Sequence, residues 1–434
     1  MHQPQSPSNS YPSSGSGPQD TAAVQRRTMV VLVTMQIIGT VAVGVAPSIG
    51  VLLAGEVTDN EAWAGLARTA STLGAALIGL PLGNLAARSG RRVALASGWW
   101  AAAAGGALLV AAVQWSLLVP LFIGLLLIGI GNAVSLQARF AATDLAEPQH
   151  KGRALALVVW VGTLGSVLGP NLGVPGELIS RTTGLTVFAS AFLITAICLA
   201  IAGSIVFVFL RPDPLVVLAQ STGTSRAAQP GKRRGRIRRV FAELRTNRYA
   251  RYALVAILTA QTVMVAVMTM TPVHVAHQGG SITIIGITIS LHIAGMYGLS
   301  PIVGFIADRH GHRLTIAIGI GIFLASLIIG AVIPNDTGWI MASLLLLGIG
   351  WSFVNVGGSA LFASVVSTET RASSQGGVDA LANLCGAVAA FASGPLLAIS
   401  NFTVLNILAI GVLVPLTLLT AAVGRITVTD RSRI

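Results

Sequence analysis

The chain has 434 residues, of which 53% are hydrophobic and only 9% are charged, and its mean hydropathy is +0.79. An average soluble domain carries about 25% charged residues, so this composition argues against a soluble enzyme, a nucleic-acid-binding protein and a disordered protein. The apolar residues form long blocks, and a helix needs about 20 such residues to span a bilayer. The sequence therefore predicts an all-α integral membrane protein.

Twelve apolar blocks follow one another along the chain, and each is long enough to be a membrane span. Their predicted ranges are 28–54, 64–87, 93–113, 116–142, 153–179, 184–210, 252–275, 281–307, 314–334, 338–366, 374–400 and 402–424.

The distribution of the 27 Lys and Arg residues predicts the orientation. With the N-terminus in the cytoplasm, 25 of them fall on the cytoplasmic side, all except Arg68 and Arg181. Cytoplasmic loops of membrane proteins carry an excess of Lys and Arg. The sequence therefore predicts a multi-pass protein of the cell membrane with both termini in the cytoplasm.

The same pattern divides the chain into five regions. We expect a disordered cytoplasmic tail over 1–27, a six-helix bundle over 28–210, a cytoplasmic linker over 211–251, a second six-helix bundle over 252–424 and a tail over 425–434. The linker carries 11 basic residues, and a cationic segment of this kind favours anionic lipid headgroups over nucleic acid.

Internal repeats support two related halves. Residues 125–131 recur as 344–350, residues 83–92 recur as 304–313, and Gly169-Pro170 recurs as Gly394-Pro395, at offsets of 219, 221 and 225. Parallel repeats of six spans are typical of secondary transporters, which bind their substrate near the bilayer midplane between the repeats.

At 83–92 and 304–313 the chain resembles the loop signature of the major facilitator superfamily, and the resemblance extends over residues 28–424. It implies two pseudo-symmetric six-helix bundles that work by alternating access. In that family the acid of the signature latches the two halves together on the cytoplasmic side. Asp308 keeps this acid, whereas the first copy has Ala87. The expected latch and gating residues are Gly83, Gly90, Arg91, Arg92, Arg139, Asp144, Asp308, Arg309 and Arg313.

The two lysines, Lys151 and Lys232, lie outside any phosphate-binding loop. We therefore expect a transporter driven by a gradient, with possible proton coupling, and not an enzyme. It would need no cofactor, would bind no nucleic acid and would act as a monomer in the lipid bilayer.

Four residues at the predicted mid-bilayer depth are soft metal ligands. Met264 and Met268 lie four residues apart in span seven, and His292 and Met296 do so in span eight. Thioethers and imidazole suit Cu⁺, and residues at i and i+4 share a helix face. Ordinary apolar packing of the methionines is the alternative.

Within the superfamily, the Met-x-x-x-Met and His-x-x-x-Met motifs resemble those of CcoA-type copper importers, whose relatives include riboflavin importers. The resemblance implies that the four residues bind the metal and that Cu⁺ or a soft copper complex is the substrate carried inward, not a cofactor. The alternatives are a proton-coupled exporter of small organic molecules, which the glycine-rich span five with its kink at Gly169 and Pro170 resembles, or an importer of a vitamin such as riboflavin.

Five further polar residues lie inside predicted spans and are candidates for the cavity wall, because burying them in lipid is costly. Hydrogen bonds between helices are their alternative role. They are Gln36, Asn132, Gln137, Asn171 and Gln261.

Overall fold

The computed structural model describes residues 18–58, 62–147, 150–222, 247–366 and 371–423. Within these ranges, twelve helical segments are long and apolar enough to cross a membrane. The prediction of an all-α protein with twelve spans is therefore confirmed. Most of the N-terminal tail, most of the linker and all of the C-terminal tail lie outside the described residues.

The first six spans are built from eight α-helices and two short turns of other helix types. They are α1 (Pro18–Val43), η1 (Ala46–Gly50), α2 (Val51–Thr58), α3 (Ala62–Ser89), α4 (Arg91–Gln114), α5 (Leu118–Thr143), α6 (Lys151–Leu168), η2 (Gly169–Leu172), α7 (Gly173–Thr183) and α8 (Val187–Phe209). A short helix, α9 (Pro214–Thr222), follows.

The last six spans comprise seven helices. They are α11 (Arg248–His277), α12 (Ile282–Gly298), α13 (Ser300–His310), α14 (His312–Val332), α15 (Thr337–Val365), α16 (Arg371–Ile399) and α17 (Phe402–Ala422). Polar caps explain several of the boundaries: the Asp336 carboxylate accepts from the Trp339 amide at 3.0 Å, and the Asn401 side chain does so from the Val404 amide at 3.0 Å.

The start of the first span differs from the prediction by ten residues. α1 begins at Pro18, ten residues before the predicted span, so residues 18–27 are helical and not part of a disordered tail. The reason lies in contacts to the rest of the first half. The Gln25 side-chain amide donates to the Ala142 carbonyl at 2.8 Å, and the Arg27 Nε donates to the Phe209 carbonyl at 3.1 Å.

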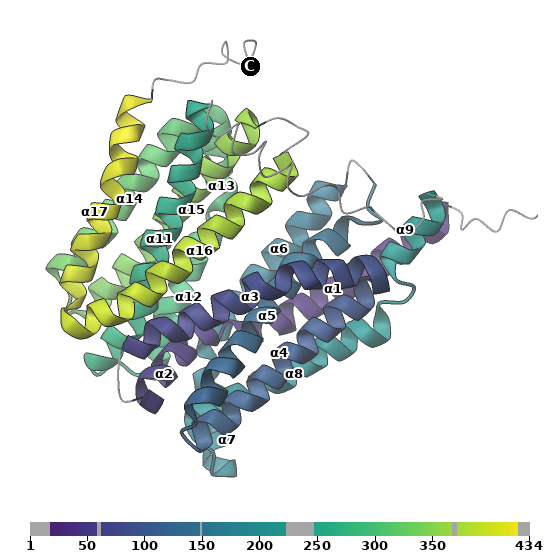
Figure 1. Ribbon diagram of the computed structural model, residues 1–434, viewed down its shortest axis with the longest axis horizontal. Helices are drawn as coiled ribbons and strands as arrows, with labels where there is room; N and C mark the ends of the chain where they lie inside the picture. The colour runs from purple at the N-terminus through teal and green to yellow at the C-terminus, as the bar shows by residue number, and fades with distance from the viewer. Residues whose placement is uncertain (1–17, 59–61, 148–149, 223–246, 367–370, 424–434) are drawn as a thin grey trace, which may run out of the picture.

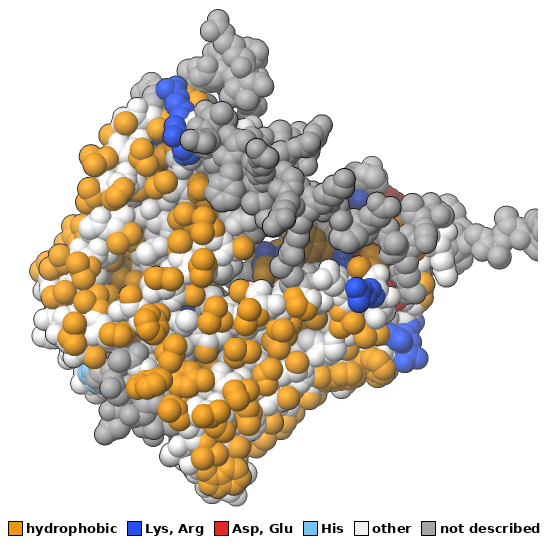
Figure 2. Space-filling model, in the orientation of Figure 1, with side chains coloured by type: hydrophobic (Ala, Val, Ile, Leu, Met, Phe, Trp, Pro, Cys, Tyr) orange, Lys and Arg blue, Asp and Glu red, His pale blue; other side chains and the backbone are white. Residues whose placement is uncertain are grey.

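Each group of six spans has its own hydrophobic core, which includes Trp99 and Phe192 in the first and Tyr252 and Phe323 in the second. In Figure 1 the two groups meet near α2 and α12 and diverge toward α9 and α13. Figure 2 shows the surface hollowed between them, with basic side chains inside the hollow. The apolar outer surface in that figure is the face that a lipid bilayer would cover.

The two ends of the bundle differ in charge. The end where α3 and α13 finish carries Arg88, Arg91, Arg92, Arg309 and Arg313, and we call it the basic end. At this end the α3–α4 and α13–α14 turns each contain a glycine with positive φ, Gly90 at +93° and Gly311 at +90°. Side-chain-bearing residues rarely adopt this conformation. The repeated signature thus makes the same turn in both halves.

Within the described residues, the hydrogen bonds between the two halves lie toward the opposite end, where α3 begins. The Thr69 hydroxyl donates to the Ala387 carbonyl of α16 at 3.0 Å. The Asn171 side-chain amide donates to the Ser290 hydroxyl at 2.7 Å, and that hydroxyl donates to the Val167 carbonyl at 2.5 Å. The halves are therefore closed against each other at the opposite end.

Candidate functional site: a cavity between the two halves

A cavity of about 340 Å³ lies between the two halves, and residues of both line it. Polar side chains from the first half include Gln36 and Thr40 of α1, Arg68 and Thr72 of α3, Asn132, Ser135 and Arg139 of α5, and Thr163 of α6. The second half contributes Gln261, Met264 and Met268 of α11, Met296 and Tyr297 of α12, Trp351 of α15 and Asn383 of α16.

Hydrogen bonds hold part of this wall in place. The Gln36 side-chain amide donates to the Ser135 hydroxyl, and Gly162 leaves room for it because a Cβ there would lie 2.7 Å from the Gln36 nitrogen. Across the cavity, the Trp351 indole donates to the Gln261 side-chain oxygen at 3.2 Å. The ring centroids of Tyr297 and Trp351 are 5.7 Å apart with an interplanar angle of 70°.

The predicted metal ligands separate into two groups. Met264, Met268 and Met296 line the cavity, whereas His292 is fully buried and lies outside its lining. The His292 Nδ1 lies 2.8 Å from the Leu344 carbonyl, to which it donates. Close packing of α12 on α15 explains this position, since a Cβ on Gly348 would lie 2.2 Å from the His292 carbonyl oxygen. Three of the four expected ligands therefore line the cavity, and the fourth, His292, lies against α15 outside its lining.

Among the described residues, no group of three or more His, Cys, Asp or Glu side chains is placed to hold a metal ion. The thioethers of Met264, Met268 and Met296 are the soft ligands that the cavity offers.

Three of the five predicted cavity residues line the cavity, and two lie elsewhere. Gln36, Asn132 and Gln261 line the cavity. Asn171 does not, because its amide is bonded to Ser290 in the contact between the halves. Gln137 belongs to a polar network at the basic end, described next.

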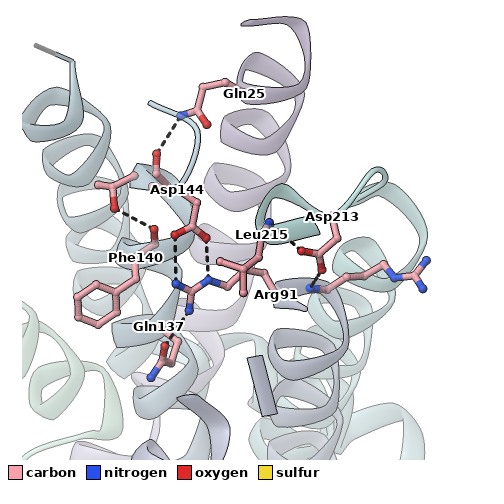
Figure 3. Close-up of polar contacts among 10 residues, drawn as sticks. Gln25, Arg91, Gln137, Phe140, Asp144, Asp213 and Leu215 are labelled. Carbon is pink, nitrogen blue, oxygen red and sulfur yellow. Dashed lines mark hydrogen bonds and ion pairs between the residues drawn. The ribbon is translucent and has the colours of Figure 1, made fainter. Parts of the chain in front are cut away.

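This network surrounds Arg91 (Figure 3). The guanidinium binds Asp144 through two hydrogen bonds, from Nε at 2.8 Å and from Nη2 at 3.2 Å, and its Nη1 donates to the Gln137 side-chain oxygen at 3.2 Å. Gln137 in turn donates to the Gly79 carbonyl at 3.3 Å. Of the expected gating residues, Arg91 and Asp144 thus pair with each other, whereas Arg139 faces the cavity.

A second acid, Asp213, binds the backbone next to the α3–α4 turn. The Asp213 carboxylate accepts from the Arg92 backbone amide at 2.7 Å and from the Leu215 amide at 2.9 Å (Figure 3). It thus sits at the N-terminus of α4, where negative charge is favourable. A Cβ on Gly90 would lie 2.4 Å from this carboxylate. Asp213 therefore gives the first signature loop, which has Ala87 in place of the acid, a carboxylate from elsewhere in the chain.

The second signature loop is arranged differently. Arg313 donates from Nε to the Thr420 carbonyl at 2.8 Å, and Arg309 lies over the Phe305 ring at 5.9 Å. Asp308 is exposed, and within the part of the chain that the structure describes its carboxylate has no hydrogen-bonding partner. The latch expected at Asp308 is thus open here.

Span five is interrupted at Gly169 and Pro170. α6 ends at Leu168, a short 3₁₀ turn follows over η2, and α7 continues the span. A Cβ on Gly169 would lie 2.5 Å from the Val41 carbonyl oxygen and 2.6 Å from the Gly44 Cα, so this glycine permits close packing on α1.

Sequence reasoning missed several residues of the cavity wall, foremost Arg68. Tyr297, Trp351 and Asn383 were missed as well. An Arg near a predicted span boundary reads as a loop residue, because long basic side chains near helix ends extend to the membrane surface. The available signal was the position of Arg68 inside the predicted span 64–87.

Comparison with known proteins places this architecture in one family. The model of the Major Facilitator Superfamily matches residues 28–296 and 274–434. The uncharacterized MFS-type transporter YddS of Bacillus subtilis (strain 168) is 34% identical over 393 residues, which are 90% of this chain and 89% of that protein.

Two further proteins are similar at lower identity. The riboflavin transporter RfnT of Brucella anthropi is 28% identical over 389 residues, 89% of this chain and 92% of that protein. The crystal structure of the nucleoside transporter NupG shares the fold with a TM-score of 0.69 at 16% identity, covering 92% of this chain and 98% of that one. None of these comparisons supports the expected resemblance to copper importers. The chain belongs to the Major Facilitator Superfamily, and it is a membrane transporter of a small solute and not an enzyme.

Proposed function

We propose that the chain carries a small organic solute across the cell membrane by alternating access, with the cavity between the halves as its binding site. The observation that carries this proposal is the composition of the cavity wall. Amides, hydroxyls and two aromatic rings line it, from both halves. A site with a few oriented polar groups among apolar and aromatic side chains is typical of organic ligands.

The orientation follows from charge. We infer that the basic end, and with it both termini, lies in the cytoplasm. The hydrogen bonds between the halves lie toward the opposite end, so this conformation is closed on the outside and its cavity faces inward. Reporter fusions within residues 220–240 test this orientation, and an extracellular position of that segment would refute it.

Copper is the weaker candidate. The thioethers of Met264, Met268 and Met296 favour it, but His292 lies outside the cavity wall. Arg68 and Arg139 also place two positive charges in the wall, and these repel a metal cation. The similarity to a protein named as a riboflavin transporter favours an organic solute over a metal.

Uptake measurements separate the two candidates. We expect cells that express the chain to differ from vector controls in uptake of labelled riboflavin or in retention of a fluorescent dye, and not in uptake of labelled copper. Met268→Leu and His292→Leu keep most of the side-chain bulk and remove the metal ligand, so copper content should be unchanged in both. Copper accumulation that disappears in both variants at normal protein level would refute the proposal.

A further inference from the structure

Two guanidinium groups line the cavity without an acidic partner. Arg68 projects from α3 and Arg139 from α5. The Nε atoms of both are buried and have no hydrogen-bonding partner within the described ranges. Neither side chain forms an ion pair with any of the residues that the structure describes. Asp379 of α16 is near enough for its charge to interact with that of Arg139, but the two form no ion pair.

The cavity wall itself contains no acid among the described residues: no Asp or Glu is among its lining side chains. Burying an unpaired charge is costly, and charges within a membrane protein are normally paired or exposed to a water-filled cavity. Two such groups in one cavity also repel each other. An anion bound between them would offset both costs.

The chemistry of the two groups specifies the anion. The planar guanidinium offers several N–H donors in a fixed fork, which matches the oxygens of a carboxylate, sulfonate or phosphate. Both groups come from the first half. The wall contributed by the second half is different, with the Tyr297 and Trp351 rings, whose centroids are 5.7 Å apart, and three thioethers.

Aromatic rings and thioethers pack favourably on flat ring systems. The Trp351 ring is also held in place, because its indole nitrogen donates to Gln261 at 3.2 Å. The cavity of about 340 Å³ has room for a compound of a few fused rings.

We infer that the solute is an organic anion, with a flat ring system packed against the second half and an acidic group held by Arg68 and Arg139. This inference rests on the proposed function and narrows its substrate class. The positive charges of Arg68 and Arg139 disfavour the binding of organic cations and of Cu⁺ in this cavity.

Two dyes of matched shape and opposite charge test the charge preference. Fluorescein is anionic and rhodamine 123 is cationic, and both have a xanthene ring system. With the purified full chain in lipid nanodiscs, fluorescence polarisation measures the binding of each dye. We expect fluorescein to bind more tightly. Arg68→Gln and Arg139→Gln should each weaken its binding about tenfold or more, because each removes charge-assisted hydrogen bonds.

Two variants serve as controls. Arg68→Lys keeps the charge and should retain more fluorescein binding than Arg68→Gln. Arg181 is exposed on α7 and outside the cavity wall, so Arg181→Gln should bind fluorescein like the unmodified chain. Unchanged thermal unfolding of the Gln variants separates lost binding from lost folding.

Three outcomes would overturn the inference: tighter binding of rhodamine 123, no fluorescein binding by the folded chain, or fluorescein binding that is equal in the Arg68→Gln, Arg139→Gln and Arg181→Gln variants. Transport in proteoliposomes distinguishes this failure from failure of the proposed function. If an organic solute is carried equally well by the Arg68 and Arg139 variants, the anion assignment is wrong and the carrier function stands. If fluorescein binds but no organic solute crosses the membrane, the carrier function is wrong.

Discussion

Gly65 lies where α3 crosses α16 at the closed end of the protein, and replacing it should open that end. An alanine Cβ at this position would lie 2.1 Å from the Ala390 carbonyl oxygen. Favourable contacts lie at about 3.5 Å or more, so the two helices would have to separate by about 1 Å or more. This separation would also break the nearby 3.0 Å hydrogen bond from Thr69 to the Ala387 carbonyl.

The size of the effect follows from these two contacts. Overpacking costs about 1–3 kcal/mol, and the lost hydrogen bond costs about 1 kcal/mol. The conformation closed at this end would therefore be disfavoured by about 2–4 kcal/mol, which is a shift of about 30-fold to almost 1,000-fold in the equilibrium. The conformation that opens this end separates the helices and does not incur either cost.

Distances between spin labels measure this shift. Thr182 at the end of α7 and Ser400 after α16 are both exposed and belong to different halves. Labels at these positions, in a background with Cys198 and Cys385 replaced by Ala, should move farther apart in Gly65→Ala.

A glycine on the same helix provides the control. A Cβ on Gly79 would meet nothing within 4 Å, so Gly79→Ala should leave the distance distribution unchanged. If Gly65→Ala and Gly79→Ala give the same distribution, the steric reasoning is wrong.

Three further expectations concern the basic end. Asp308→Asn should slow transport two- to fivefold at normal protein level, because a latch carboxylate that pairs with the N-terminus of a facing helix contributes about 0.3–1 kcal/mol; native transport rates would contradict an Asp308 latch. Arg91→Gln should lower the free energy of unfolding by about 1.5–3 kcal/mol, since it removes charged hydrogen bonds, and the exchange of Arg91 with Asp144 should recover part of it in thermal unfolding. Asp213→Ala should cost about 0.5–2 kcal/mol as a lost cap of α4, whereas Asp213→Asn keeps an acceptor and should cost less; equal losses would argue against capping.

The membrane spans were predictable because lipid imposes one requirement on every span, which is a long apolar helix with internally satisfied backbone groups. The predicted span 93–113 corresponds to α4 at 91–114, and 402–424 to α17 at 402–422. The start of α1 was not predictable in this way, because residues 18–27 are ordered by hydrogen bonds to distant parts of the chain.

The candidate site was predictable only in part. The spacing of Met264 and Met268 correctly indicates a shared face, and both line the cavity. The same spacing is not sufficient for His292 and Met296. Residues four apart are rotated by about 40° in both pairs, but on α12 the edge of the cavity-facing surface falls between the two side chains. That rotation leaves Met296 in the wall and turns His292 toward Leu344 of α15. Which of two neighbouring helix faces meets a cavity depends on packing between helices, and the sequence does not contain that information in a local pattern.

Arg68 and Thr69 are consecutive residues of α3, and their side chains make different contacts. Arg68 lines the cavity, while the Thr69 hydroxyl holds α16. Both residues belong to the same turn of α3. A displacement of the helix at one position therefore also displaces the other. On the inference that Arg68 binds the solute, solute binding and closure are therefore coupled through α3. Substitutions at the two positions will be non-additive, and any change of cargo preference acquired at position 68 will alter the opening equilibrium of the carrier with it.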